Sequence, residues 1–103
     1  MALQINTQLT SKDGASVPSG SYVKLEVYFP MEEDAYNASM KVWRNEGAYI
    51  GGLTSYRPIQ IPKLNFQKQL TPAEMSGITP TQVHLDAKAY LETYVGEGNV
   101  DVL

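Results

Sequence analysis

Cysteine is absent from this 103-residue chain. Its absence excludes a disulfide framework, a zinc site built on thiolates and a thiol nucleophile. Histidine is almost absent as well: His84 is the only one, so a metal site has no second imidazole to support it. We therefore expect the protein to carry no metal and no cofactor.

Clusters of basic residues are also missing from the sequence. The eight lysines and arginines are spread from Lys12 to Lys88, and the net charge is −3. Because a protein that neutralises phosphates needs basic residues close together, we expect no nucleic acid as a main partner. No apolar run approaches the length of a membrane span, and the first residues lack the features of a signal peptide. We expect no membrane partner and synthesis in the cytoplasm.

The residues that are present predict a single folded domain over residues 1–103. Hydrophobic residues make up 43% of the chain, which is too many for a disordered segment. A chain of this length also buries enough of its surface to form a core.

The clearest predicted element is a helix within Ser76–Tyr94. Thr79 is its expected N-cap, Pro80 occupies the first helical position, and Gln82 completes a capping box with Thr79. Gly96 is expected to end the helix. The 3.6-residue period predicts an apolar face and an opposite, solvent-facing side. The apolar face comprises Val83, Ala87, Tyr90, Leu91 and Tyr94, and the solvent-facing side comprises Asp86, Lys88 and Glu92.

The residues before this helix predict strands and turns. Tyr22–Phe29 and Tyr36–Arg44 both alternate apolar and polar residues, which is the pattern of half-buried strands. Asn45-Glu46-Gly47 predicts a tight turn that joins the second of these strands to Ala48–Arg57 in a hairpin. The apolar residues then change parity at Pro62-Lys63, which predicts a bulge or a kink.

The order of these elements predicts the fold class. About five or six strands followed by a late helix indicate an α+β fold. Hairpin connections favour antiparallel pairing, so we expect a mainly antiparallel β sandwich or small barrel with one C-terminal helix packed on it. Thr71–Glu74 repeats the helix start signal on a smaller scale and predicts a short helix before the main one.

Both ends of the chain are expected to be extended. Residues 1–20 are interpreted as an N-terminal arm and loop. Residues 2–9 alternate, which predicts either a half-buried strand or an extended arm. Thr10–Ser21 is rich in Ser, Gly, Asp and Pro, with a turn at Lys12-Asp13-Gly14. Residues 99–103 alternate as well, and they are interpreted as either a C-terminal edge strand or a free tail.

No set of residues in the sequence predicts catalysis. His84 and Asp86 are two positions apart on the expected helix and point in different directions, so we interpret His84 as structural or superficial. The run Glu32-Glu33-Asp34 lacks the alternating ligand spacing of a calcium loop and is interpreted as a solvated loop. We expect a protein that is not an enzyme.

The aromatic residues are unusual in kind. The chain has seven tyrosines and one tryptophan but only two phenylalanines. Tyrosine and tryptophan are favoured at interfaces because each combines a large contact area with a polar tip. One hypothesis places Tyr22, Tyr28, Trp43 and Tyr49 on the aromatic face of a small carbohydrate- or peptide-binding module. The other is that they cover the edges of a small core.

Four stretches define the layout of the chain: the polar arm Met1–Ser21, the strand Ser21–Phe29, the turn Asn45-Glu46-Gly47, and the segment from Leu70 to the end of the helix at Tyr94. This layout resembles the small accessory proteins of tailed-phage virions and related contractile particles. The resemblance implies a non-enzymatic neck, head–tail joining, capsid-decorating or baseplate protein. It also implies a homo-oligomer that contacts other particle proteins, made in the host cytoplasm and then built into the particle.

Strand addition to a neighbouring sheet is the expected mode of assembly, because both chain ends alternate. We therefore expect a chain without residues 1–9 to fold but not to assemble. The candidate interface residues are Leu3, Ile5, Leu9, Tyr22, Tyr28, Trp43, Tyr49, Val100 and Val102.

Overall fold

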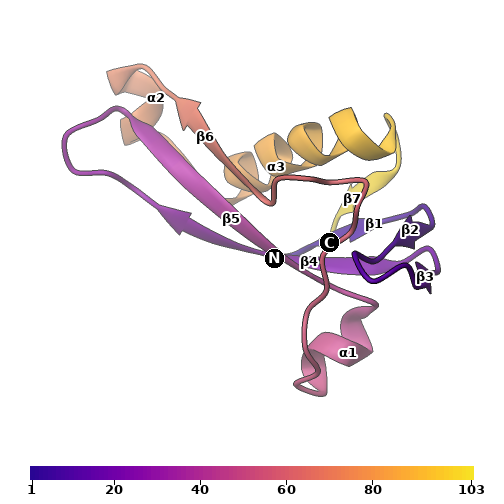
Figure 1. Ribbon diagram of the computed structural model, residues 1–103. Coiled ribbons are helices and arrows are strands. Elements are labelled where there is room, and N and C mark those ends of the chain that lie inside the picture. The colour runs from indigo at the N-terminus through magenta and orange to yellow at the C-terminus, as the bar shows by residue number, and fades with distance from the viewer.

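Figure 1 shows the computed structural model, which describes all residues from Met1 to Leu103. Five strands come first, and three helices and two further strands follow them. In order they are β1 (Leu3–Ile5), β2 (Leu9–Thr10), β3 (Ser16–Val17), β4 (Ser21–Tyr28), β5 (Ala35–Trp43), α1 (Glu46–Ile50), β6 (Asn65–Gln69), α2 (Pro72–Ser76), α3 (Pro80–Val95) and β7 (Val100–Val102).

Five of the seven strands form one sheet, in the spatial order β6-β5-β4-β1-β7. Every neighbouring pair in it is antiparallel. The other two strands, β2 and β3, form a separate ribbon that flanks the turn at Lys12–Gly14. The predicted turn is therefore confirmed, and the stretch expected as a loop contains two short paired strands.

The predicted α+β class is confirmed. The antiparallel sheet curls into a half-barrel, and helix α3 packs along it, as Figure 1 shows. The core lies between the helix and the sheet, where apolar side chains from both are removed from water. The larger of its two clusters of buried residues comprises Leu3, Ile5, Leu9, Val23, Met40, Val42, Ile61, Ala87, Leu91 and Val100. The smaller comprises Tyr36, Ala38 and Val83.

The ends of helix α3 are largely where the sequence predicts them. The Thr79 hydroxyl accepts a hydrogen bond from the N–H of Gln82 at 3.1 Å, and Pro80 is the first helical residue. The Gln82 side chain, however, donates to Asp86 rather than back to Thr79, so the capping box is only half formed. Gly96 ends the helix with a positive φ of 98°, a conformation that glycine adopts without strain.

The short helix α2 is confirmed, with its capping box complete. The Thr71 hydroxyl accepts from the N–H of Glu74 at 3.2 Å, and the Glu74 carboxylate accepts from the N–H of Thr71 at 2.9 Å. No residue of α2 is buried. The capping box therefore satisfies backbone N–H groups at the start of a helix that lies on the surface.

Of the two interpretations of residues 2–9, the half-buried strand is confirmed and the extended arm is wrong. Strand β1 lies inside the main sheet, where Leu3 pairs with Val23 of β4 on one side and with Val102 of β7 on the other. Leu3 and Ile5 are completely buried. The alternation that suggested a free arm is the pattern of a sheet strand with one face in the core. At the other end of the chain, β7 is an edge strand.

The predicted hairpin after β5 is also wrong. Asn45 does not start a tight turn but caps helix α1, because its side chain accepts a hydrogen bond from the N–H of Ala48 at 2.8 Å. The chain returns to β5 only as an isolated bridge between Val42 and Tyr56. The strand that pairs with β5 along its length is β6.

The helices are short or amphipathic rather than uniformly apolar. None of them has both the length and the apolar character that a membrane-spanning helix requires.

Candidate interaction surface

Four of the candidate interface residues are core residues instead. Leu3, Ile5, Leu9 and Val100 are completely buried. Their prediction as interface residues is wrong, because β1 lies between two strands, β7 is paired with it, and Leu9 of β2 packs into the same core. Val102 is half-buried on the edge strand.

Three of the predicted aromatic residues do come together. Tyr22 and Trp43 are direct partners across β4 and β5, on the sheet face opposite the core, and helix α1 lays Tyr49 against both. The Tyr49 ring centroid is 5.2 Å from that of Tyr22 and 4.8 Å from that of Trp43. Lys24 extends over the Tyr49 ring, with 5.5 Å between its Nζ and the ring centroid. We call these four residues the aromatic cluster.

The rings of the aromatic cluster find most of their contacts within the protein. The rings pack against one another in tilted and edge-to-face arrangements, which suit the quadrupoles of aromatic rings. The Trp43 indole N–H already donates to the Leu53 carbonyl at 2.8 Å. The cluster therefore fixes α1 to the sheet and leaves Tyr49, which is 36% exposed, as its most open ring.

Tyr28 is not part of this cluster. It lies at the far end of the same two strands, opposite Asn37, and is 63% exposed. Here the chain turns from β4 into β5 through residues 29–34. Figure 1 shows this turn at the opposite end of the molecule from the β2–β3 ribbon, with both chain termini between them.

The end of the β4–β5 hairpin carries exposed apolar residues beside exposed acids. We call residues 27–34 the hairpin tip. Val27 and Phe29 are about two-fifths exposed, and Met31 is 99% exposed. The acidic run Glu32-Glu33-Asp34 follows directly, fully on the surface. Its prediction as a solvated loop is confirmed. The Glu33 carboxylate accepts one side-chain hydrogen bond, from Gln67 at 2.9 Å, and the Asp34 carbonyl accepts one from the Leu70 N–H at 2.7 Å.

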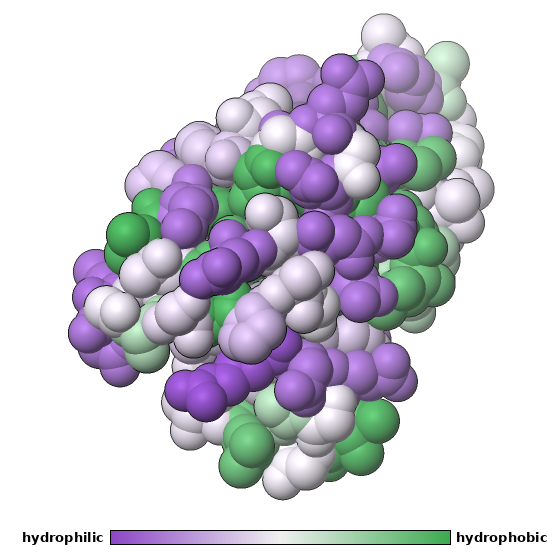
Figure 2. Space-filling view, turned by 90° about the vertical axis from the view of Figure 1, so that its right-hand side faces the viewer, coloured by the Kyte–Doolittle hydropathy of each residue, from purple (hydrophilic) through white to green (hydrophobic).

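A second exposed apolar area surrounds helix α1. Ile50 and Leu53 are 72% and 63% exposed. In Figure 2, hydrophobic side chains gather at the lower end of the molecule, which is where α1 lies in Figure 1, while hydrophilic side chains dominate the middle of that face.

Strand β6 leaves one backbone edge of the main sheet unpaired, since β5 is its only partner. Its alternate residues are exposed and polar: Asn65, Gln67 and Gln69. Polar side chains along an edge limit pairing with other chains.

Asp86 lies at the centre of a polar network that the sequence does not reveal. Its carboxylate accepts hydrogen bonds from Tyr36 Oη at 2.7 Å, Lys68 Nζ at 2.9 Å and Gln82 Nε2 at 3.0 Å. Burial alone would raise the pKa of Asp86, but the hydrogen bonds from Lys68, Tyr36 and Gln82 outweigh it and lower the pKa below its usual value. The prediction that Asp86 faces solvent is wrong, because the carboxylate ties α3 to β5 and β6.

His84 has no catalytic partner. The side chain is buried, its Nδ1 lies 2.7 Å from the Pro80 carbonyl oxygen, and its Nε2 has no hydrogen-bond partner in the protein. No group of three or more histidine, aspartate or glutamate side chains comes close enough to hold a metal ion. The interpretation of His84 as a structural residue fits this position.

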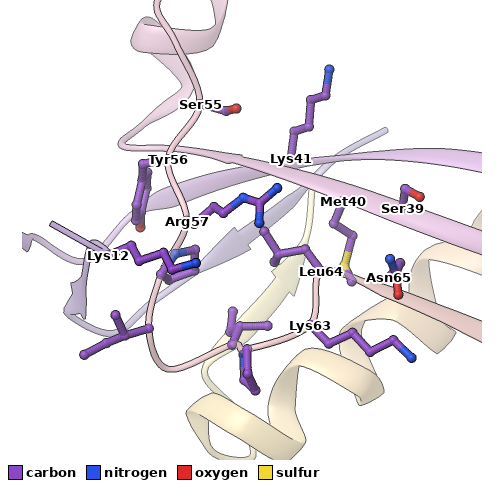
Figure 3. Close-up of a pocket in the computed structure, with 14 residues that line it drawn as sticks. Lys12, Ser39, Met40, Lys41, Ser55, Tyr56, Arg57, Lys63, Leu64 and Asn65 are labelled. Atoms are coloured by element: carbon purple, nitrogen blue, oxygen red, sulfur yellow. The ribbon is translucent and has the colours of Figure 1, made fainter.

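A groove of about 690 Å³ lies between β5 and residues 55–65. The groove is lined by basic residues that are far apart in the sequence, and no alternation or spacing in the sequence predicts it. Figure 3 shows Lys12, Lys41, Arg57 and Lys63 around this groove. They come from the β2–β3 turn, from β5 and from the chain between α1 and β6.

In comparisons with known proteins, no protein-family model, no curated protein and no solved structure matches the chain.

Proposed function

We propose that the protein is a non-enzymatic structural subunit that assembles with copies of itself through the hairpin tip. The observation that carries this proposal is the tip's exposed apolar surface, with Met31 almost completely in solvent beside Tyr28 and Phe29.

The physical basis is the cost of keeping apolar side chains in water. Burying apolar surface contributes roughly 25 cal/mol per Å². Single exposed hydrophobic residues are common and need no explanation, but a contiguous group at a protruding end of a molecule is a feature of interaction sites. The molecule measures 43 × 28 × 23 Å, and the hairpin tip protrudes at one end of it (Figure 1).

For the kind of assembly, we propose a virion or phage-like contractile particle, in which this chain contacts copies of itself and other structural proteins. Support for this class comes from the layout of the sequence, with the strand Ser21–Phe29 and the capped segment from Leu70 to Tyr94. The turn predicted at Asn45 no longer contributes, because Asn45 caps α1. Strand addition by residues 1–9 is no longer part of the proposal, because these residues contribute to the core.

The test is the molar mass in solution, measured by light scattering over a dilution series. We expect the parent chain to form oligomers that dissociate on dilution. Met31→Asp should remain monomeric at concentrations where the parent is oligomeric, since it places a charge where apolar surface is buried. Leu53→Asp is the matched control at the α1 patch and should assemble like the parent. A parent chain that stays monomeric throughout, or a Met31→Asp variant that assembles normally, would contradict the proposal.

A second candidate function is a small carbohydrate- or peptide-binding module. The observation that favours it is the aromatic cluster, which places three rings and Lys24 on the sheet face opposite the core. Trp43 is the only tryptophan, so its fluorescence reports on this surface alone. A saturable fluorescence change with a defined glycan or peptide would favour this function, and silence across a glycan array would count against it.

A further inference from the structure

The groove beside β5 is strongly basic although the protein is acidic overall. Four of the chain's eight basic residues line it, and no acidic residue does. The single ion pair in the protein joins Lys68 to Asp86, outside the groove. The four cations of the groove therefore have no carboxylate partner within the chain.

The carboxylate nearest in sequence does not neutralise the groove. Asp13 follows Lys12, but its oxygen accepts hydrogen bonds from the Ser11 hydroxyl and from the N–H of Ala15. These bonds hold the pKa of Asp13 below its usual value. The Asp13 carboxylate thus forms its hydrogen bonds within the β2–β3 turn.

The groove has an apolar floor and a fixed wall. Met40, Ile61 and Pro58 line it and are buried. The backbone of residues 55–65 is held at several points, so the groove is formed before anything binds. These points are Tyr56 N–H to Val42 O, Arg57 O from Lys12 N–H, Ile59 N–H to Thr10 O and Leu64 O from Met40 N–H, all at 2.8 Å, and Lys63 O from Tyr90 Oη at 2.6 Å.

The cations are placed on the rims. In Figure 3, Lys41 and Lys63 extend from opposite sides of the groove, Arg57 lies between them, and Lys12 lies to the left, near Tyr56. All four side chains are exposed. A ligand suited to this site has several negative charges and an apolar part that reaches the floor.

The hairpin tip has both properties. It presents three acids in a row, Glu32-Glu33-Asp34, directly after Met31. We propose that the groove receives the hairpin tip of a second copy of this chain, with the acids between the rim cations and Met31 on the apolar floor. This inference rests on the proposed function and specifies the surface that meets the tip.

A chain does not place its own tip in its own groove. The tip ends at Asp34, and Lys41 is seven positions further along the extended strand β5. At about 3.3 Å per residue, these two sites are roughly 23 Å apart on a continuous strand. The contact is therefore between molecules, and it joins two different surfaces. Such a head-to-tail contact generates a ring if the rotation closes and a filament if it does not.

Charge reversal on each side tests this docking. One variant carries Glu32→Lys and Asp34→Lys, and it keeps Glu33, which accepts a hydrogen bond from Gln67. The other variant carries Lys41→Glu and Arg57→Glu. Each variant alone opposes like charges, so we expect its dissociation constant to rise by at least about tenfold, which corresponds to about 1.4 kcal/mol. An equimolar mixture pairs opposite charges at both contacts and should assemble to the parent's size. Single reversals elsewhere, Glu97→Lys and Lys88→Glu, should leave assembly unchanged.

The outcomes separate this inference from the proposed function. If both reversed variants assemble like the parent, the tip docks elsewhere: the inference fails and self-assembly stands. If they lose assembly but the mixture does not regain it, the groove does not bind the tip. If the parent itself is monomeric, both proposals fail. Assembly unaffected by reversal, together with calorimetric binding of inorganic phosphate that Lys41→Glu/Arg57→Glu abolishes, would assign the groove to a phosphate ligand instead.

Discussion

At the scale of single residues, Asp86 joins three elements. Tyr36 is completely buried, and its hydroxyl reaches the Asp86 carboxylate from β5, while Lys68 reaches it from β6. Burial comes first among the causes that raise the pKa of Tyr36, and the hydrogen bond to Asp86 adds to it. The phenol thus stays protonated and acts as a donor.

Replacing Tyr36 by phenylalanine tests this hydrogen bond. A hydrogen bond to a charged group contributes about 1.5–3 kcal/mol, and its loss leaves the carboxylate with two donors. We expect Tyr36→Phe to lower the free energy of unfolding by about 1–2 kcal/mol, because Lys68 and Gln82 still serve Asp86. Urea denaturation measures the change. Tyr28→Phe, on the exposed tip, is the control and should leave the midpoint almost unchanged.

The pH dependence of stability provides a second test of the same carboxylate. The pKa of Asp86 is lower in the folded protein than its ordinary value of 3.8. Its contribution to stability is therefore present above that ordinary value and is lost as the pH falls through the lower, folded pKa. We expect Asp86→Asn to be less stable than the parent at pH 7, and the difference to shrink at pH 3. Urea midpoints at the two pH values measure it, and a constant difference would refute this role.

Sequence patterns identify such residues poorly. The apolar face of α3 was predicted correctly for Val83, Ala87 and Leu91, because core burial follows helical spacing. The polar partners of Asp86 are 50 and 18 positions away in Tyr36 and Lys68. A helical wheel places Asp86 outside the apolar face but does not show what faces it.

At the scale of elements, the position of β1 decides what the N-terminal residues do. The strand pairs on both sides and contributes Leu3 and Ile5 to the core, and Leu9 follows them. Without β1, β7 loses its only neighbour in the sheet. We therefore expect the first strand to be required for folding.

Deleting residues 1–9 should unfold the protein. Removing three completely buried aliphatic side chains costs several kcal/mol for each, against a total stability of about 5–15 kcal/mol for a typical domain. We expect the deletion variant to lack a cooperative thermal transition by circular dichroism. Removal of Leu103, which is half exposed and follows β7, is the control and should preserve the transition. A cooperative transition in the deletion variant would restore the idea of a free arm.

The elements that the sequence predicted correctly are those with local signals. Thr79-Pro80 and Gly96 mark the ends of α3, and Thr71 marks the start of α2. The hairpin after β5 was predicted wrongly because Asn45 suits both a tight turn and a helix cap. The strand that pairs with β5 is β6, which begins 30 positions after Ala35. No local sequence signal predicts a pairing over that distance.

At the scale of the whole molecule, charge is distributed unevenly. The acids of the hairpin tip lie at one end, and the basic groove lies further along β5. Neither surface is evident from the net charge of −3, and the groove exists only because the fold brings Lys12, Arg57 and Lys63 to the same place. A chain with two complementary surfaces at different places is suited to repeated head-to-tail contacts.

The most direct test of the central claim is a series of amide ¹⁵N–¹H NMR spectra recorded as the protein is concentrated. It identifies the residues that meet when copies associate. We predict concentration-dependent shifts and broadening at residues 27–34 of the hairpin tip and along the groove at residues 39–41 and 55–65, with Leu53 and the β7 strand unaffected. Changes confined to α1 or to β7, or spectra that do not change with concentration, would contradict assembly through the hairpin tip.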